Sequence, residues 1–227
     1  MENITVAILG DPGEAILQQL AALGPHVKIH AGKTAAALMP VLPEARIVFS
    51  WGGTRDDMAP IFRSAPRLEW IHSRSAGLDK FLFPELIESP IPVTNGSGVF
   101  SQALGEFAIF GALYFAKNMP RLLASKAARH WDGFECYELG TQTMGIVGHG
   151  DIGRACAWRA KALGMKVLAL RRDPAPRPGD EHVDRVYRTE ALAEMLPECD
   201  YVVAAAGLNL SRQRGKPLIQ HQYACHD

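Results

Sequence analysis

The sequence runs Met144-Gly145-Ile146-Val147-Gly148-His149-Gly150-Asp151-Ile152-Gly153 through the stretch that decides the fold. The apolar, β-branched run before Gly148 predicts a strand, and residues 154–163 have the composition of a helix. Three glycines, Gly148, Gly150 and Gly153, therefore lie where a strand is followed directly by a helix. This order of strand, glycines and helix is typical of a βαβ unit that binds a dinucleotide.

Each glycine of this stretch has a separate physical task. Gly148 permits the tight turn out of the strand, Gly150 leaves room for a pyrophosphate, and Gly153 lets the helix pack closely on the strand. The helix would then direct its free N–H groups and positive dipole end at the phosphates. We predict a cofactor site made of Gly148, His149, Gly150, Asp151, Ile152 and Gly153. The plainer interpretations are a structural turn without a ligand and, for His149 and Asp151, ordinary loop residues at the edge of the site.

The end of the next predicted strand bears on the choice of cofactor. An Asp or Glu about 20 residues beyond the glycines would bind the ribose 2′-hydroxyl of NAD. Arg171 and Arg172 occupy that position here, and the nearest acid, Asp173, is displaced from it. Arginine can pair with a 2′-phosphate and stack on adenine. These residues favour NADP, with NAD as the alternative, and the plainer interpretation is that both arginines are solvated surface charges.

Short β-branched runs alternate with helical segments along most of the remaining chain. Strands are expected at residues 4–9, 27–30, 47–50, 69–73, 92–95, 144–147, 166–170, 183–187 and 200–206. This βαβα order predicts an α/β fold with two Rossmann-like parallel sheets, the second of them incomplete. The segment from Ala103 to Asn118 is apolar almost all round, so we expect a buried helix that ends at Pro120.

The composition excludes some classes of partner. The chain has 24 Lys and Arg against 24 Asp and Glu, so it lacks the basic excess that nucleic-acid binding requires. Its longest apolar run, residues 108–116, is well below the length of a membrane span. The four cysteines form no closely spaced pair, which favours reduced thiols and argues against a metal site. We expect a cytoplasmic protein that binds neither nucleic acid nor membrane.

Several segments together resemble the D-isomer-specific 2-hydroxyacid dehydrogenases, in particular their glyoxylate/hydroxypyruvate reductase-like branch. The segments are Arg74-Ser75-Ala76-Gly77-Leu78-Asp79, Thr94-Asn95-Gly96-Ser97-Gly98-Val99 with Glu106, Trp131, the glycine stretch above, and Cys199-Asp200-Tyr201-Val202-Val203. The resemblance covers about residues 1–206. It implies hydride transfer between NAD(P)H and a small 2-oxo acid, such as glyoxylate or hydroxypyruvate, in a cleft between two domains.

The resemblance also implies how the chain is divided. Residues 1–100 would form a flavodoxin-like substrate domain, and residues 101–207 a dinucleotide-binding Rossmann domain that is incomplete at its C-terminal side. Residues 208–227 have neither strand nor helix periodicity and do not match the family. The family usually dimerises through its cofactor domain, including the helix that matches residues 101–118, so we expect a homodimer through this domain.

A loop of the first domain carries the predicted substrate site. In the family, the loop that matches Ser75, Ala76 and Gly77 presents backbone N–H groups to the substrate carboxylate, as an anion-binding nest would. Gly52 follows a neighbouring strand and would line the same cleft. An ordinary strand-to-helix turn is the plainer interpretation of residues 75–77.

The residues that perform the family's chemistry have no counterpart in this sequence. The arginine, the histidine and the acid come from the second half of the family's cofactor domain, and no matching motif follows Ala206. We therefore predict no catalytic residue, and we interpret His221, Cys225 and His226 as part of an unstructured terminus rather than as a metal site. The two competing hypotheses are an oxidoreductase of this family and an inactive, truncated form that binds nucleotide or pairs with a full-length copy.

Overall fold

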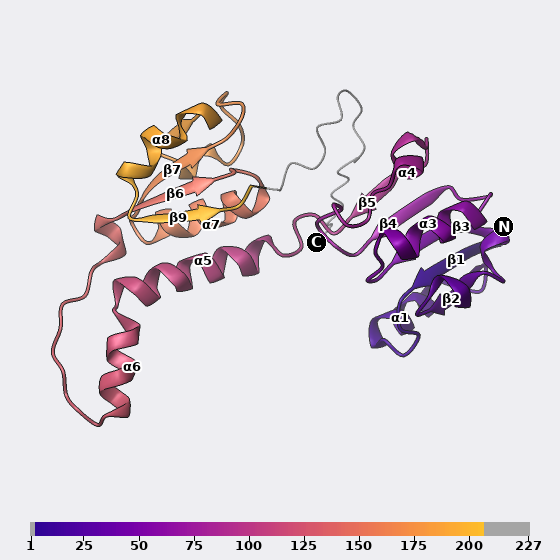
Figure 1. Ribbon diagram of the computed structural model, residues 1–227, viewed down its shortest axis with the longest axis horizontal. Coiled ribbons are helices and arrows are strands. Elements are labelled where there is room, and N and C mark those ends of the chain that lie inside the picture. The colour runs from indigo at the N-terminus through magenta and orange to yellow at the C-terminus, as the bar shows by residue number, and fades with distance from the viewer. Residues whose placement is uncertain (1–2, 207–227) are drawn as a thin grey trace. The chain divides into compact units, whose positions relative to one another are not determined.

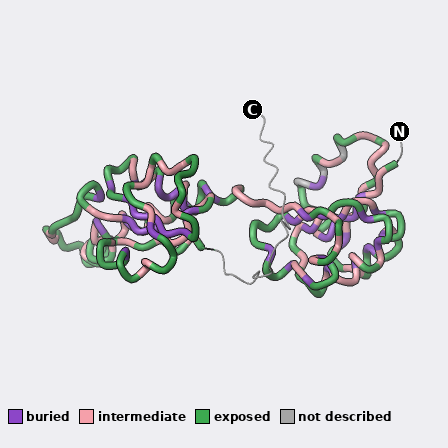
Figure 2. The backbone as a smooth tube through the Cα atoms, turned by 90° about the horizontal axis from the view of Figure 1, so that it is seen from above, coloured by how far each residue is buried: buried purple, intermediate pink, exposed green. Residues whose placement is uncertain are grey.

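The computed structural model describes residues 3–206, which divide into two compact units between Ser97 and Gly98. Each unit consists of one parallel sheet with helices packed against it (Figure 1). Buried residues gather at the centre of each unit, and exposed residues form its outer surface (Figure 2). Each unit therefore has a hydrophobic core of its own.

Five parallel strands form the sheet of the first unit, in the order β2-β1-β3-β4-β5. They are β1 (Ile4–Leu9), β2 (Val27–Gly32), β3 (Ala45–Ser50), β4 (Trp70–Ser73) and β5 (Val93–Asn95). This is the flavodoxin-like strand order, in which the sequence of strands across the sheet reverses between β1 and β3. Ligands of such sheets bind outside the carboxyl ends of the strands, near the reversal.

The helices of the first unit cover the two faces of this sheet unequally. They are α1 (Ala15–Gln19), α2 (Ala35–Leu38), α3 (Arg55–Ser64) and α4 (Pro84–Glu88), with 3-10 turns η1 (Leu20–Leu23) and η2 (Leu42–Glu44). The main core joins Leu38, Ile61 and Leu86 of α2, α3 and α4 to Val48 and Ile71 of the sheet. A smaller cluster on Val6, Ile8 and Leu17 lies beneath α1.

Four parallel strands form the sheet of the second unit, in the order β8-β7-β6-β9. They are β6 (Thr143–Val147), β7 (Lys166–Leu170), β8 (Arg185–Tyr187) and β9 (Tyr201–Ala204). Counted from β6, this is the 3-2-1-4 arrangement with which the Rossmann fold begins. The α/β fold with two Rossmann-like parallel sheets is therefore confirmed.

The helices of the second unit are α5 (Ser101–Ala116), α6 (Met119–Ala127), α7 (Asp151–Ala162) and α8 (Leu192–Met195). Its 3-10 turns are η3 (Leu139–Thr141), η4 (Asp180–His182), η5 (Thr189–Ala191) and η6 (Leu196–Glu198). Helices α5 and α7 pack closely because Gly105 lies against Ala155, whose backbone oxygen is 3.0 Å from where a Cβ atom at Gly105 would lie. None of the described helices has the length and apolar character needed to cross a bilayer.

The long helix differs from its prediction in two respects. It ends at Ala116, and Pro120 lies in the first turn of α6, where its missing N–H group costs nothing; the left-handed Asn118 (φ 46°) separates the two helices. Only one face of α5 is buried, at Ser101, Gly105, Ala112 and Ala116. Its other face exposes large side chains, among them Phe107 at 71 %. An all-round apolar sequence indicates that a helix prefers burial, but it does not say what covers each face.

Candidate functional site

The glycine loop joins β6 to α7 in the second unit. Gly148 has φ 98°, a conformation that favours glycine, and a Cβ atom there would lie 2.6 Å from the backbone nitrogen of Ala206. A Cβ atom at Gly153 would clash with the carbonyl oxygen of Gly148. The first glycine thus permits the turn and its contact with the segment after β9, and the last one permits the helix to approach the strand.

Gly150 stands apart from the other two glycines. It is exposed, and a Cβ atom built on it would meet no described atom within 4 Å. It is also the N-cap of α7, and no side chain caps that end of the helix. Asp151 in the first turn forms an ion pair with Arg154. The N-terminus of α7 therefore has open space beside Gly150, as an anion-binding site at a helix end requires.

This open space lies at the topological switch point of the second sheet. Strand β6 has β7 on one side and β9 on the other, so the order in which the strands are added to the sheet reverses at β6. The segment after β9 is fixed to the end of β6, because the Ala205 N–H donates to the Val147 carbonyl over 2.8 Å. A parallel α/β sheet binds its ligand at this crevice.

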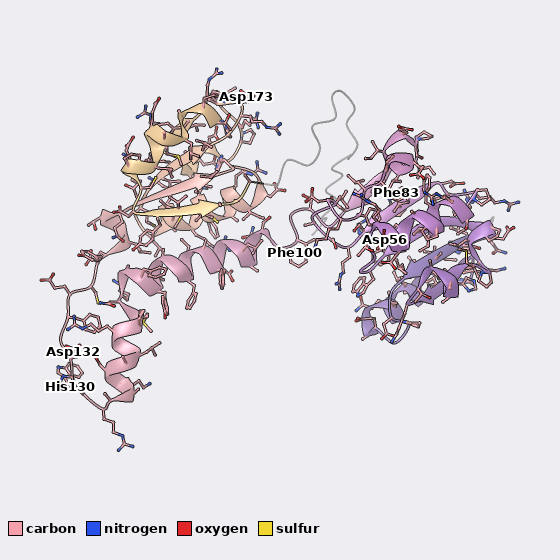
Figure 3. All side chains as sticks on the ribbon, in the orientation of Figure 1. Asp56, Phe83, Phe100, His130, Asp132 and Asp173 are labelled. Carbon is pink, nitrogen blue, oxygen red and sulfur yellow. The ribbon has the colours of Figure 1, made fainter. Side chains whose placement is uncertain are left out.

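The two arginines after β7 have very different surroundings. The Arg171 side chain is 6 % exposed, and it donates to both carboxylate oxygens of Asp180, over 2.6 and 2.7 Å. The side chain of Arg172 is exposed and has no hydrogen-bond or ion-pair partner within residues 3–206. Asp173, at the outer margin of the second unit (Figure 3), pairs with Arg177 over 2.7 Å. The sequence grouped Arg171 and Arg172 together, and the structure separates them.

Charge and burial fix the protonation of the groups around Arg171. The hydrogen bonds from Arg171 lower the pKa of Asp180 to about 2, and a bond from the Arg177 N–H acts in the same direction. The same pairing raises the pKa of Arg171. Burial lowers the pKa of His149, which keeps its imidazole neutral at pH 7.

His149 is buried, which the interpretation as an edge loop residue did not anticipate. Its Nδ1 atom lies 3.4 Å from both Asp180 Oδ1 and the Arg171 guanidinium. Its Nε2 atom is buried and finds no hydrogen-bond partner among the described residues. The second position of the glycine motif therefore connects the loop to the segment that follows β7.

The predicted substrate loop, residues 75–77, follows β4 in the first unit and is exposed. Its shape depends on the segment after β5, because Asn95 Nδ2 donates to the Ala76 carbonyl over 2.6 Å and the Gly96 N–H donates to the Ser75 carbonyl over 3.3 Å. A Cβ atom at Gly96 would clash with the carbonyl oxygen of Arg74. Asn95 and Gly96 belong to a motif quoted from the sequence, but only the structure shows that they support this loop.

Gly52 lies next to that loop, because β3 and β4 are neighbours and Ser50 pairs with Ser73. Gly52 is exposed, with no described atom within 4 Å of a Cβ position. The preceding residue, Trp51, has the Arg74 guanidinium 4.4 Å from its ring centre, and its buried Nε1 atom has no partner among the described residues. Ser75, Ala76, Gly77 and Gly52 therefore lie together at the carboxyl end of this sheet.

The remaining predictions fall in the tail. His221, Cys225 and His226 lie outside the described residues, as does the whole segment 207–227. Between residues 3 and 206, no three His, Cys, Asp or Glu side chains are grouped as metal ligands would be.

Comparison with known proteins identifies a family that this chain matches. The family model described as "D-isomer specific 2-hydroxyacid dehydrogenase, NAD binding domain" matches residues 109–214, which include the whole glycine loop. Residues 109–214 therefore belong to the D-isomer-specific 2-hydroxyacid dehydrogenases. The resemblance inferred from the motifs is thereby confirmed, and the second unit contains a family NAD-binding domain.

Individual members of this dehydrogenase family are similar over much of the chain. The glyoxylate reductase of Thermococcus kodakarensis is 30 % identical over 162 residues, which make up 67 % of this chain and 48 % of that protein. The hydroxypyruvate reductase of Thermotoga maritima is 29 % identical over 167 residues, or 73 % of this chain and 52 % of that protein. This chain thus spans about half the length of the curated relatives it matches.

A solved member of the dehydrogenase family shares the fold of this chain. The crystal structure of a D-isomer specific 2-hydroxyacid dehydrogenase family protein from Aeromonas salmonicida aligns with a TM-score of 0.74 at 26 % identity. The alignment covers 91 % of this chain and 65 % of that one.

Proposed function

We propose that this chain binds a nicotinamide dinucleotide at the glycine loop and a small 2-oxo acid at the loop of residues 75–77, for reversible hydride transfer between them. The open helix end at Gly150 carries the proposal, because it combines the N-terminus of a helix with space for a pyrophosphate. The relatives named glyoxylate reductase and hydroxypyruvate reductase support the choice of substrate class. The nicotinamide ring would supply or accept the hydride, and the protein binds and orients both reactants.

The dinucleotide is assigned to Gly148, His149, Gly150, Asp151, Ile152 and Gly153, with Arg171 and Arg172 at the adenosine end. We favour NADP over NAD because the exposed guanidinium of Arg172 is available to a 2′-phosphate. In addition, no acid occupies the first position after β7, where a carboxylate would bind the 2′-hydroxyl of NAD.

The substrate carboxylate is assigned to the backbone of Ser75, Ala76 and Gly77, with Gly52 beside it. The N–H groups of Ala76 and Gly77 donate no hydrogen bond to a described residue, so they remain available to an anion. Arg74 adds positive charge at the same edge, where it is held over Trp51. Free N–H groups after a strand are a known form of anion nest.

The open face of α5 supports a second proposal, that the second unit pairs with another copy of its family. Large apolar side chains are exposed along this face; they are Leu104, Phe107, Phe110 and Phe115. Patches of this kind mark contact surfaces of proteins. This pairing does not require catalysis, so it also serves the alternative of an inactive chain that binds nucleotide or a full-length copy.

Two measurements on the purified chain test the proposed binding and turnover. Titration with NADPH and NADH, followed by nicotinamide fluorescence, is expected to show saturable binding that is tighter for NADPH. Oxidation of NADPH with glyoxylate or hydroxypyruvate then separates the enzyme from the inactive form. Binding without turnover favours the inactive form, and absence of binding to either dinucleotide would disprove the assignment of the glycine loop.

A further inference from the structure

The segment between β7 and η4 is held to the end of the sheet by the ion pair between Arg171 and Asp180. The chain leaves β7 at Leu170 and returns at Asp180, whose carboxylate accepts from both terminal nitrogens of Arg171. Arg171 also donates from Nε to the Asp173 carbonyl over 2.7 Å and from a terminal nitrogen to the Ala175 carbonyl. One side chain thus fixes both ends and the middle of the loop at residues 172–179.

The same ion pair fixes this loop to the glycine loop. His149 Nδ1 lies 3.4 Å from the carboxylate and from the guanidinium, and the imidazole is buried. Gly179, with φ 94°, lies against the aliphatic part of Arg154 on α7, where a Cβ atom would be 2.5 Å from Arg154 Cδ. Two contacts therefore hold the loop at residues 172–179 against the start of α7, the helix assigned to the pyrophosphate.

The hydrogen bonds of Arg171 decide what it can do. A guanidinium has five N–H donors. Four of the five donate to oxygen atoms, those of the Asp180 carboxylate and of the Asp173 and Ala175 carbonyls, and the remaining terminal N–H faces His149 Nδ1 at 3.4 Å. With its side chain 6 % exposed, Arg171 has neither the surface nor a free donor to offer to a 2′-phosphate.

We propose that Arg171 and Asp180 are positioning residues, which together with His149 shape the adenosine side of the dinucleotide site, while Arg172 alone contacts the 2′-phosphate. The proposal rests on the assignment of the glycine loop to a nicotinamide dinucleotide. The adenosine and its ribose are common to NADH and NADPH, so the ion pair serves both cofactors equally. Arg172 serves only the cofactor that carries the extra phosphate.

Affinities of three variants for the two cofactors test this division of roles. R171Q and D180N are expected to weaken the binding of NADPH and NADH together, each by about tenfold, so that their ratio stays near that of the unaltered chain. R172Q is expected to weaken NADPH binding by about tenfold and to leave NADH binding unchanged. R172Q changes an exposed side chain, and it remains informative if the two buried variants do not fold.

A spectroscopic measurement separates positioning from general destabilisation. The imidazole NMR signals of His149 are expected to shift in D180N and R171Q and to stay in place in R172Q, because only the first two variants remove a neighbour of the ring. Loss of NADPH binding alone in R171Q, or an unchanged NADPH-to-NADH ratio in R172Q, would overturn the inference while leaving the dinucleotide site intact. Failure of the unaltered chain to bind either cofactor would instead refute the proposed function, and this inference with it.

Discussion

The loops after β6 and β4 both follow the carboxyl end of a parallel strand, but they are held in shape by different means. The glycine loop keeps its form through its own backbone, because Gly148 has a positive φ and Gly153 touches the carbonyl of Gly148. The loop of residues 75–77 takes its form from a distant segment, through Asn95 and Gly96. A motif that is contiguous in sequence can be recognised without a structure, whereas support from another strand cannot.

The largest effect is expected within the glycine loop, from a comparison of two of its glycines. Gly153→Ala places a methyl group against a backbone oxygen, and we expect a loss of about 2 kcal/mol of unfolding free energy, together with loss of dinucleotide binding. Gly150→Ala projects the methyl group into open space, so it should keep the stability within about 0.5 kcal/mol while weakening NADPH binding. Urea denaturation measures the stability of the two variants, and NADPH titration measures their binding. Equal stability of the two variants would contradict the distinction.

An effect of similar size is expected from acid, on the second unit. The pKa of Asp180 is lowered from 3.8 to about 2 in the folded protein, mainly by Arg171, so its contribution is complete above pH 4 and is lost as the pH falls toward 2. The expected loss of unfolding free energy is about 2 kcal/mol, since one pKa unit corresponds to about 1.4 kcal/mol. Denaturation between pH 5 and pH 2, followed at residues of the second unit, measures it.

The control for that measurement is D180N, which removes the titrating group. This variant should be less stable at neutral pH and should lose the part of the acid dependence that Asp180 contributes. If the unaltered chain and D180N show the same slope of stability against pH, the ion pair does not contribute as described.

The smallest effect is expected at the predicted substrate loop, because its exposed backbone can shift away from an added methyl group. Gly96→Ala directs its methyl group at the Arg74 carbonyl, but residues 74–77 are exposed, so we expect a cost of about 1 kcal/mol. Hydrogen exchange should become faster at Ser75 and at residue 96, whose N–H groups donate to Ser73 Oγ and to the Ser75 carbonyl. Gly52→Ala is the matched control, because its methyl group meets no described atom. A larger cost for Gly52→Ala than for Gly96→Ala would show that the support comes from elsewhere.

Much of the architecture follows from local patterns. Strands β1 and β7 begin and end where the sequence indicates, and the helix after the glycine loop begins at Asp151, only three residues before its predicted start. Alternating β-branched runs and helical segments are enough for this, because each element of a βαβ unit carries its own periodicity. The second helix after Asn118 could not be predicted so easily, since Pro120 is compatible with either the end or the start of a helix.

The candidate site divides along the same line. The residue pattern by itself determined the α/β class, the family, the glycine loop and the place of the two arginines after β7, because these depend on residue types at fixed short spacings. Only the tertiary structure decided that the guanidinium of Arg171 is occupied by its ion pair with Asp180, that Arg172 faces solvent, and that Asn95 supports the loop after β4. These outcomes depend on which distant groups share a buried space, and a side chain's free hydrogen-bonding capacity is known only after every neighbour has been placed.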